Sequence, residues 1–129
     1  IVVSATKLKG CKPAIEYYAD VASKFELPLR TLSLGYETIG QLRAVWAIAQ
    51  EEKVDLLVLV VTDRHVKRVR WICKREGIKA EIVACGGIPN PAEVRTDFIL
   101  QYAYPIMDAI GILDWFINMT VQRRLRGKL

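Results

Sequence analysis

Apolar residues along this chain follow two patterns, short unbroken runs and longer stretches with helical spacing. The runs are rich in valine, leucine and isoleucine and are bounded by glycine, proline or charged residues, which is typical of buried strands. The stretches between them repeat apolar side chains every three or four residues, which predicts amphipathic helices. Strands are predicted over residues 1–5, 27–34, 56–61 and 79–85, and helices over residues 13–25, 37–52, 64–75, 91–104 and 106–124.

The third predicted strand leads directly into a helix. Thr62 and Asp63 stop the apolar run and are typical N-cap residues for the helix that follows. The first N–H groups of that helix are expected at the carboxyl edge of a parallel sheet, where α/β proteins bind ligands and helix N-termini favour anions. His65 and Arg68 are three residues apart and share a helix face there. We therefore expect an imidazole and a guanidinium to be exposed to an anion at this edge.

Strands that alternate with helices predict parallel strands joined by βαβ crossovers. The predicted fold class is α/β: a three-layer, Rossmann-like domain with a small, mainly parallel sheet and C-terminal helices. The chain has 129 residues, enough for one domain (1–129) and too few for two of ordinary size. Because the sheet starts abruptly at Ile1, we expect that a first strand–helix unit is missing. Residues 98–119 are apolar, but charged residues and Pro105 interrupt them, so a buried helical pair is expected rather than a membrane span.

The composition is that of a folded protein, with 52% apolar and 26% charged residues. The net charge of +5 favours anionic partners such as phosphates, nucleotides, nucleic acid or an acidic membrane surface. A charge of this size also serves solubility alone, and the sequence does not choose between the two interpretations.

The cysteines Cys11, Cys73 and Cys85 are odd in number and have no motif spacing, which indicates a reducing compartment and not a disulfide framework. Cys73 and Cys85 are interpreted as packing residues. One histidine and unpaired cysteines leave little for a zinc site, so no metal is expected. No secretory signal is visible, and a cytoplasmic protein is expected.

Three segments, each following a predicted strand, are expected to converge at the carboxyl edge of the sheet. They offer hydroxyl, amide, carboxylate and cationic groups, a set suited to a small anionic ligand. The candidate ligand-binding residues are Ser4, Thr6, Lys7, Thr38, Gln41, Thr62, Asp63, His65 and Arg68. A Ser4–Asp63–His65 triad has no G-x-S-x-G elbow to support it. No P-loop or G-x-G-x-x-G follows a strand, so neither a cofactor nor a reaction is assigned.

The helix predicted over residues 64–75 carries a second feature, a cationic face around Trp71. The cations on this face are Arg64, Lys67, Arg68, Lys74 and Arg75. An exposed tryptophan among cations can stack a base, so one alternative function is a nucleic-acid-binding module that uses this face and the basic tail. The simpler interpretation is that a C-terminal helix or a second subunit covers Trp71. A further alternative is a non-catalytic domain that dimerises through Trp71 or the apolar C-terminal helices.

Residues 61–68 (VTDRHVKR) resemble the motif V-T-S-x-x-H-x-x-R of the YdcF/SanA/ElyC family, a domain of unknown function, with one residue fewer before the histidine. Residues 35–41 are similar to the family pattern S-x-N-T-x-E-N and keep its threonine as Thr38. The other positions of that pattern differ, with Glu37, Gly40 and Gln41 where the family has Asn, Glu and Asn.

The ends of the chain carry the same resemblance. Residues 1–4 are similar to the family's I-V-S-G strand, with Ala5 in place of the glycine, and residues 108–113 (DAIGIL) are similar to E-x-x-G-L-L. The resemblance implies a Rossmann-like fold with a polar cleft lined by Ser4, Thr38 and the segment 62–68.

Family members begin one strand earlier, with a glycine-rich loop and a helix that help to build the site, so the resemblance also implies a missing first unit. For bacterial relatives it implies a role in envelope and peptidoglycan-precursor metabolism and a nucleotide-like or phosphate-bearing ligand. No reaction is secure for the family, so the resemblance does not decide whether this chain is an enzyme.

Overall fold

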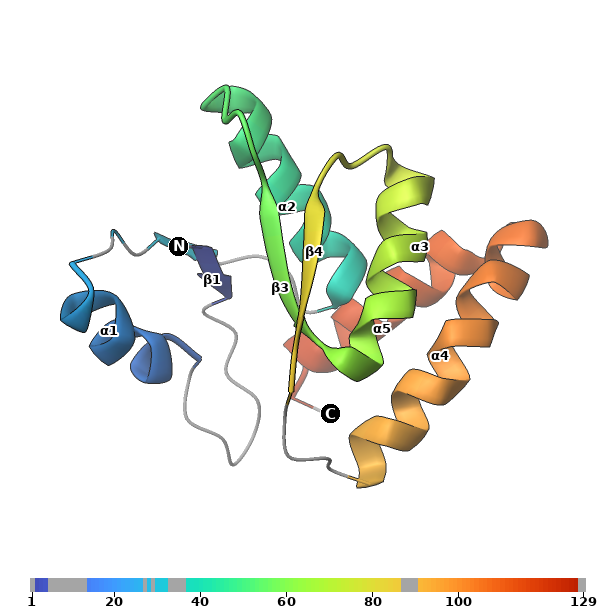
Figure 1. The fold of residues 1–129 in the computed structure, drawn as a ribbon. Helices are drawn as coiled ribbons and strands as arrows, with labels where there is room; N and C mark the ends of the chain where they lie inside the picture. The colour runs from blue at the N-terminus through green and yellow to red at the C-terminus, as the bar shows by residue number, and fades with distance from the viewer. Residues whose placement is uncertain are drawn as a thin grey trace. The chain divides into compact units, whose positions relative to one another are not determined.

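The structure is a computed structural model that describes residues 2–4, 14–26, 28, 30–32, 37–86 and 91–127. Helices and strands alternate along the described chain, and the strands pair in parallel, which confirms the predicted α/β class (Figure 1). The elements are β1 (Val2–Ser4), α1 (Ala14–Lys24), β2 (Arg30–Leu32), α2 (Thr38–Glu51), β3 (Val58–Thr62), the 3₁₀ turn η1 (Asp63–His65), α3 (Val66–Glu76), β4 (Glu81–Cys85), α4 (Pro91–Ala109) and α5 (Leu113–Leu125).

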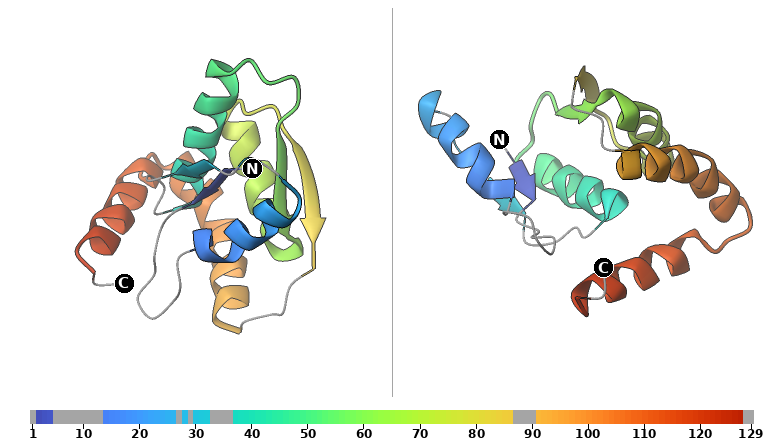
Figure 2. Two further views of the ribbon diagram at one scale, coloured as in Figure 1. Left: turned by 90° about the vertical axis from the view of Figure 1, so that its left-hand side faces the viewer. Right: turned by 90° about the horizontal axis from the view of Figure 1, so that it is seen from below.

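The chain divides into two compact units, which are described separately. The first unit is Ile1–Ile48 with Ile117–Leu129, and the second is Ala49–Phe116. In the first unit β1 and β2 are parallel, with Ser4 opposite Leu32, and α1 lies beside β1 (Figure 2). Among the side chains described on α1, Ala22 is buried.

The predicted apolar stripe of α1 is largely exposed. Helical spacing predicts one apolar stripe on this helix, formed by Ile15, Tyr18, Ala19, Ala22 and Phe25. Of its described side chains Ala22 alone is buried, and Tyr18 and Phe25 are both at least half exposed. Helical spacing predicted the helix correctly, because spacing reports which residues share a face. It does not report how much of that face another element covers.

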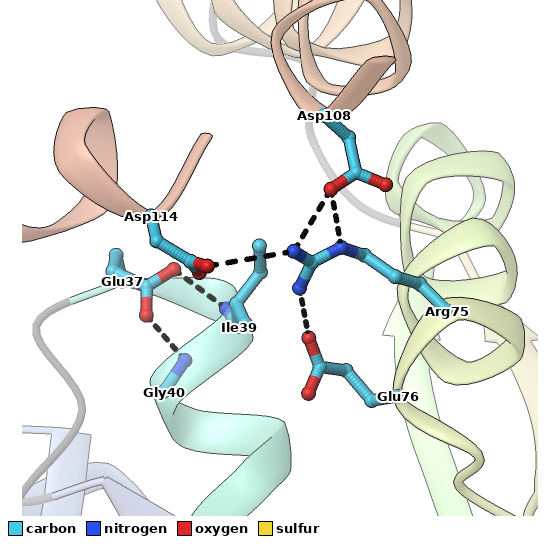
Figure 3. A network of polar contacts seen from close by, with 7 residues as sticks. All are labelled: Glu37, Ile39, Gly40, Arg75, Glu76, Asp108 and Asp114. Atoms are coloured by element: carbon cyan, nitrogen blue, oxygen red, sulfur yellow. Dashed lines mark hydrogen bonds and ion pairs between the residues drawn. The ribbon is translucent and has the colours of Figure 1, made fainter. Parts of the chain in front are cut away.

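Helix α2 is capped by the side chain of Glu37, which was not predicted from the sequence. The Glu37 carboxylate is buried just ahead of the helix and accepts hydrogen bonds from the N–H groups of Ile39 (2.7 Å) and Gly40 (Figure 3). Two of the N–H groups left without partners at a helix start are thereby satisfied, and a negative charge lies at the positive end of the helix. Helical spacing predicts one buried side for this helix, formed by Ile39, Leu42, Val45, Trp46 and Ala49. Ile39, Leu42 and Ala49 are buried, whereas Val45 and Trp46 are half-buried.

The second unit contains a β3–α3–β4 unit. Strands β3 and β4 pair in parallel, from Val58 opposite Glu81 to Thr62 opposite Cys85. Helix α3 ends at Gly77, whose positive φ of 68° places it in the left-handed region and lets its N–H bond the Cys73 carbonyl. A glycine just after the last helical residue is a common C-terminal signal, so the sequence predicts this end of the helix at Gly77 and the structure confirms it.

The expectation that the third strand is buried on both faces is wrong. Val58 and Val60 on β3 and Val83 on β4 are exposed, whereas Leu59 and Val61 are half-buried. Burial therefore alternates along β3, as in a sheet covered on one face. An unbroken apolar run places apolar side chains on both faces of the strand, so it does not show whether one face or both faces are covered.

The two C-terminal helices divide at a glycine and not at the proline. Helix α4 continues through Pro105 to Ala109, and the chain turns at Gly111, where φ is 78°. The predicted division at Pro105 is therefore wrong. The expected burial of the whole pair is also wrong, because α4 exposes several large apolar side chains on one face. Among the described helices, none has the length and apolar character needed to cross a membrane.

Candidate functional site

Helices α3 and α4 of the second unit pack side by side and run in the same direction (Figure 1). Three side chains of α3 meet three of α4, in the same order along both helices. The pairs are Arg68 with Asp97, Trp71 with Tyr104, and Arg75 with Asp108. Intervals of three and four on α3, and of seven and four on α4, keep each set on one helix face.

The first of these pairs forms a cluster with His65. One oxygen of Asp97, Oδ1, lies 2.7 Å from Arg68 Nη1 and 2.8 Å from His65 Nδ1. A third contact, of 3.0 Å, joins Arg68 Nη2 to the same His65 Nδ1. The side chains of Arg68 and Asp97 are 8% and 6% exposed, and that of His65 is 31% exposed. The cluster is therefore a buried ion pair with an imidazole at its accessible side.

The cluster lies where β3 passes into α3. Thr62 ends the strand, and the 3₁₀ turn of η1 brings His65 to the start of α3. Thr62 occupies the N-cap position of this turn with an extended backbone, but its side chain makes no cap hydrogen bond. The predicted cap by the Thr62 side chain is therefore wrong, and a tighter 3₁₀ turn opens the helix instead.

Two side-chain oxygens of this region are buried without a hydrogen-bond partner among the described residues. They are Thr62 Oγ1, at the end of β3, and Asp97 Oδ2, the second oxygen of the buried carboxylate. Buried polar atoms without partners cost free energy, so native proteins keep few of them. Such atoms are a feature of sites that complete their hydrogen bonds with water or a ligand.

The other end of the α3–α4 interface is more open and fully paired. Arg75 donates from Nε to Asp108 Oδ1 (2.9 Å), lies 3.8 Å from Asp114 through Nη2, and pairs with Glu76 through Nη1 (Figure 3). The hydrogen bond that Arg75 donates to the Asp108 carboxylate is the main reason that the pKa of Arg75 is raised. Arg75 is thus committed to carboxylates of its own chain.

Trp71 is half-buried and packs against Tyr104, with ring centroids 6.2 Å apart. Tyr104 of α4 therefore covers part of Trp71, whereas the simpler interpretation named the last helix or a second subunit as its cover, and that choice stays a prediction. The cationic face predicted around it is also reduced, because Arg68 and Arg75 pair with aspartates. Lys67 and Lys74 are exposed.

The predicted site residues are spread over both units. Ser4 ends β1, and the half-buried Thr38 and Gln41 lie in the first turn of α2, where the Gln41 N–H donates to the Glu37 carbonyl. These three belong to the first unit, so convergence of the three segments stays a prediction. Thr6 and Lys7 lie outside the described residues.

In the second unit the structure brings the predicted residues His65 and Arg68 together, while Asp63 is exposed beside them. Arg68 was expected to reach an anion directly; its terminal nitrogens instead lie against Asp97 and His65. Asp97 was missed. No local signal marked it, because Asp97 follows Glu93, Arg95 and Thr96 in a stretch where an acidic residue is unremarkable.

No group of three histidine, cysteine, aspartate or glutamate side chains in the described part of the chain could hold a metal ion. Cys73 is buried in α3, and burial raises the pKa of its thiol, as expected for a packing residue. Cys85 is exposed at the end of β4. Comparisons with protein-family models, with curated proteins and with solved structures find no match to this chain.

Proposed function

We propose that this chain binds a small anionic ligand, nucleotide-like or phosphate-bearing, at the carboxyl end of β3. The observation that carries the proposal is the position of His65: its accessible imidazole lies where a strand end meets a helix start, and a buried ion pair holds it there. Helix N-termini attract anions through their N–H groups and the helix dipole. The net charge of +5 favours the approach of an anion.

Each residue of the cluster has a distinct part in this proposal. His65 contacts the ligand, since it is the most accessible of the three side chains. Arg68 and Asp97 neutralise one another, so they position the imidazole and do not themselves supply net charge. Thr62 and Asp63 shape the turn between strand and helix.

The resemblance of residues 61–68 to the YdcF/SanA/ElyC motif supports the same ligand class. The histidine and arginine of that motif correspond to His65 and Arg68, the two residues that the structure brings together. We accordingly propose that the chain is a member of this family. Whether a reaction follows binding is left to the experiments.

Calorimetric titration with AMP and with inorganic phosphate tests the proposal. The variants are His65→Gln and, as a matched control, Lys79→Gln, which removes an exposed cation before the start of β4, at the opposite end of the strand pair. We expect wild type and Lys79→Gln to bind alike and His65→Gln to bind at least about tenfold more weakly, a loss of about 1.4 kcal/mol.

Equal affinities in all three proteins, or no binding by wild type, would contradict the proposal. A single-stranded oligonucleotide is the second ligand class to include. Affinity for it that falls steeply with salt and is insensitive to His65→Gln would favour the nucleic-acid alternative.

A second candidate function is dimerisation, and the exposed face of α4 favours it. Phe98, Tyr102 and Ile106 recur every four residues and are 65%, 56% and 62% exposed, on a helix whose other side packs on α3. Burial of an aromatic side chain removes about 150–250 Å² of its surface from solvent. A specific interface buries about 800 Å² of surface per partner. We propose a second copy of this chain as the occupant.

Light scattering is expected to give a dimer mass that Tyr102→Glu returns to the monomer value; a monomeric wild type contradicts it.

A further inference from the structure

We infer that His65 carries its proton on Nδ1, which leaves Nε2 as a proton acceptor for the ligand. This is the state of the imidazole in the protein without ligand. The nature of the ligand that delivers the proton rests on the proposed function, and the tautomer does not.

Two contacts of the cluster meet at one atom, Nδ1 of His65, whose protonation state they determine. Nδ1 of His65 lies 2.8 Å from Asp97 Oδ1 and 3.0 Å from Arg68 Nη2. A ring nitrogen either carries a proton and donates, or carries a lone pair and accepts, but does not do both. Arg68 is a donor only and an ionised Asp97 is an acceptor only, so the two contacts favour opposite states of Nδ1.

The contact with Asp97 decides the state. Without a proton on Nδ1, its lone pair would face a carboxylate oxygen at 2.8 Å inside a buried cluster, where repulsion is poorly screened. With the proton, Nδ1–H donates a charge-assisted hydrogen bond, which is among the stronger kinds. Arg68 loses little, because its Nη1 keeps a 2.7 Å bond to the same carboxylate.

A proton on Nδ1 determines what the opposite nitrogen does. In the neutral ring Nε2 then carries a lone pair, and the structure gives it no hydrogen bond to a described residue. Asp97 acts as a positioning residue that orients the ring through Nδ1–H, the part an aspartate plays toward a general-base histidine. The charged groups in contact with the ring are Asp97 from α4 and Arg68 from α3.

The ligand that suits an accepting Nε2 is one with a transferable O–H. A phosphate monoester has a second ionisation near pH 6 and meets this requirement in its singly protonated form. On binding, the phosphate O–H bond breaks, an Nε2–H bond forms, and the electron pair remains on oxygen. The products are a dianion and an imidazolium, whose two N–H groups donate to the phosphate and to Asp97.

The first experiment reads the tautomer directly. The chain contains one histidine, so ¹⁵N–¹H long-range correlation spectra of the full chain without ligand show a single imidazole. At a pH where the ring is neutral, we expect a protonated Nδ1 and an unprotonated Nε2. The double variant Arg68→Met/Asp97→Leu removes both partners and is expected to move the proton to Nε2, while Asp108→Ala, at the other end of the interface, leaves it on Nδ1. A wild-type spectrum with the proton on Nε2 overturns the inference.

The second experiment asks whether binding takes up a proton. Between pH 7 and 9, where AMP is a dianion, we expect its affinity to fall as the pH rises, since each complex takes up one proton from solution. An affinity for AMP that does not change over this range contradicts proton acceptance by His65. A protein that shows the Nδ1–H tautomer but no affinity for AMP refutes the proposed function alone, so the two failures are distinguishable.

Discussion

The two ends of the α3–α4 interface use the same pair of residues in different surroundings. At each end an arginine of α3 meets an aspartate of α4. Arg68 and Asp97 are 8% and 6% exposed, whereas Arg75 and Asp108 are 20% and 34% exposed. At the buried end two side-chain oxygens have no hydrogen-bond partner among the described residues; at the open end the arginine contacts three carboxylates.

We interpret this difference as one between an ion pair that joins two helices, at the open end, and an ion pair that serves the candidate site, at the buried end. An exposed ion pair contributes little to stability and is tolerant of change. A buried pair is costly to desolvate and costly to break, so its retention in a fold calls for a reason beyond stability. In our proposal that reason is His65, which contacts both Asp97 and Arg68. The open end joins α3 to α4 and carries no ligand role in our proposal.

Removal of the buried carboxylate is expected to have the largest effect on stability. Asp97→Ala leaves the Arg68 guanidinium buried without its main partner, so we expect the free energy of unfolding to fall by about 3–5 kcal/mol. Urea unfolding followed by circular dichroism measures this loss.

The double variant Arg68→Met/Asp97→Leu is the matched control for that change. It removes both charges and fills a similar volume, so its stability is expected to be close to that of wild type or higher. A double variant as unstable as Asp97→Ala would show that the loss comes from packing and not from an unpaired charge.

Removal of the Asp108 carboxylate, at the open end, is expected to have a much smaller effect on the free energy of unfolding. In Asp108→Ala the Arg75 side chain keeps Glu76 and Asp114 as partners and is partly hydrated, so we expect a loss of about 0.5–1 kcal/mol by the same urea unfolding. The contribution of the Arg75–Asp108 pair to stability is also expected to fall with added salt. A loss equal to that of Asp97→Ala would mean that exposure does not distinguish the two ends.

Features encoded locally could be predicted from the sequence. The spacing of apolar residues predicted α2 and α3, Gly77 marked the end of α3, and the three-residue interval placed His65 and Arg68 on one helix face. Each of these depends on neighbours within one or two helical turns, where a sequence pattern reports geometry directly.

Features that depend on distant partners could not be predicted in the same way. Asp97 lies 29 positions after Arg68, and no local pattern names the residue that a buried aspartate will meet. The exposure of Val60 depends on what covers the sheet, which the composition of the strand does not state. Pro105 was read as a break, but α4 accommodates it and turns at Gly111, where the backbone needs a left-handed residue.

The two cysteines of the second unit give direct experimental access to the candidate site. Cys85 is exposed at the end of β4, opposite Thr62 in the sheet register, whereas Cys73 is buried within α3. A thiol-reactive fluorophore would therefore attach at Cys85 in preference to Cys73 while the protein is folded. Its emission would report on events a few residues from His65 without a substitution in the cluster itself.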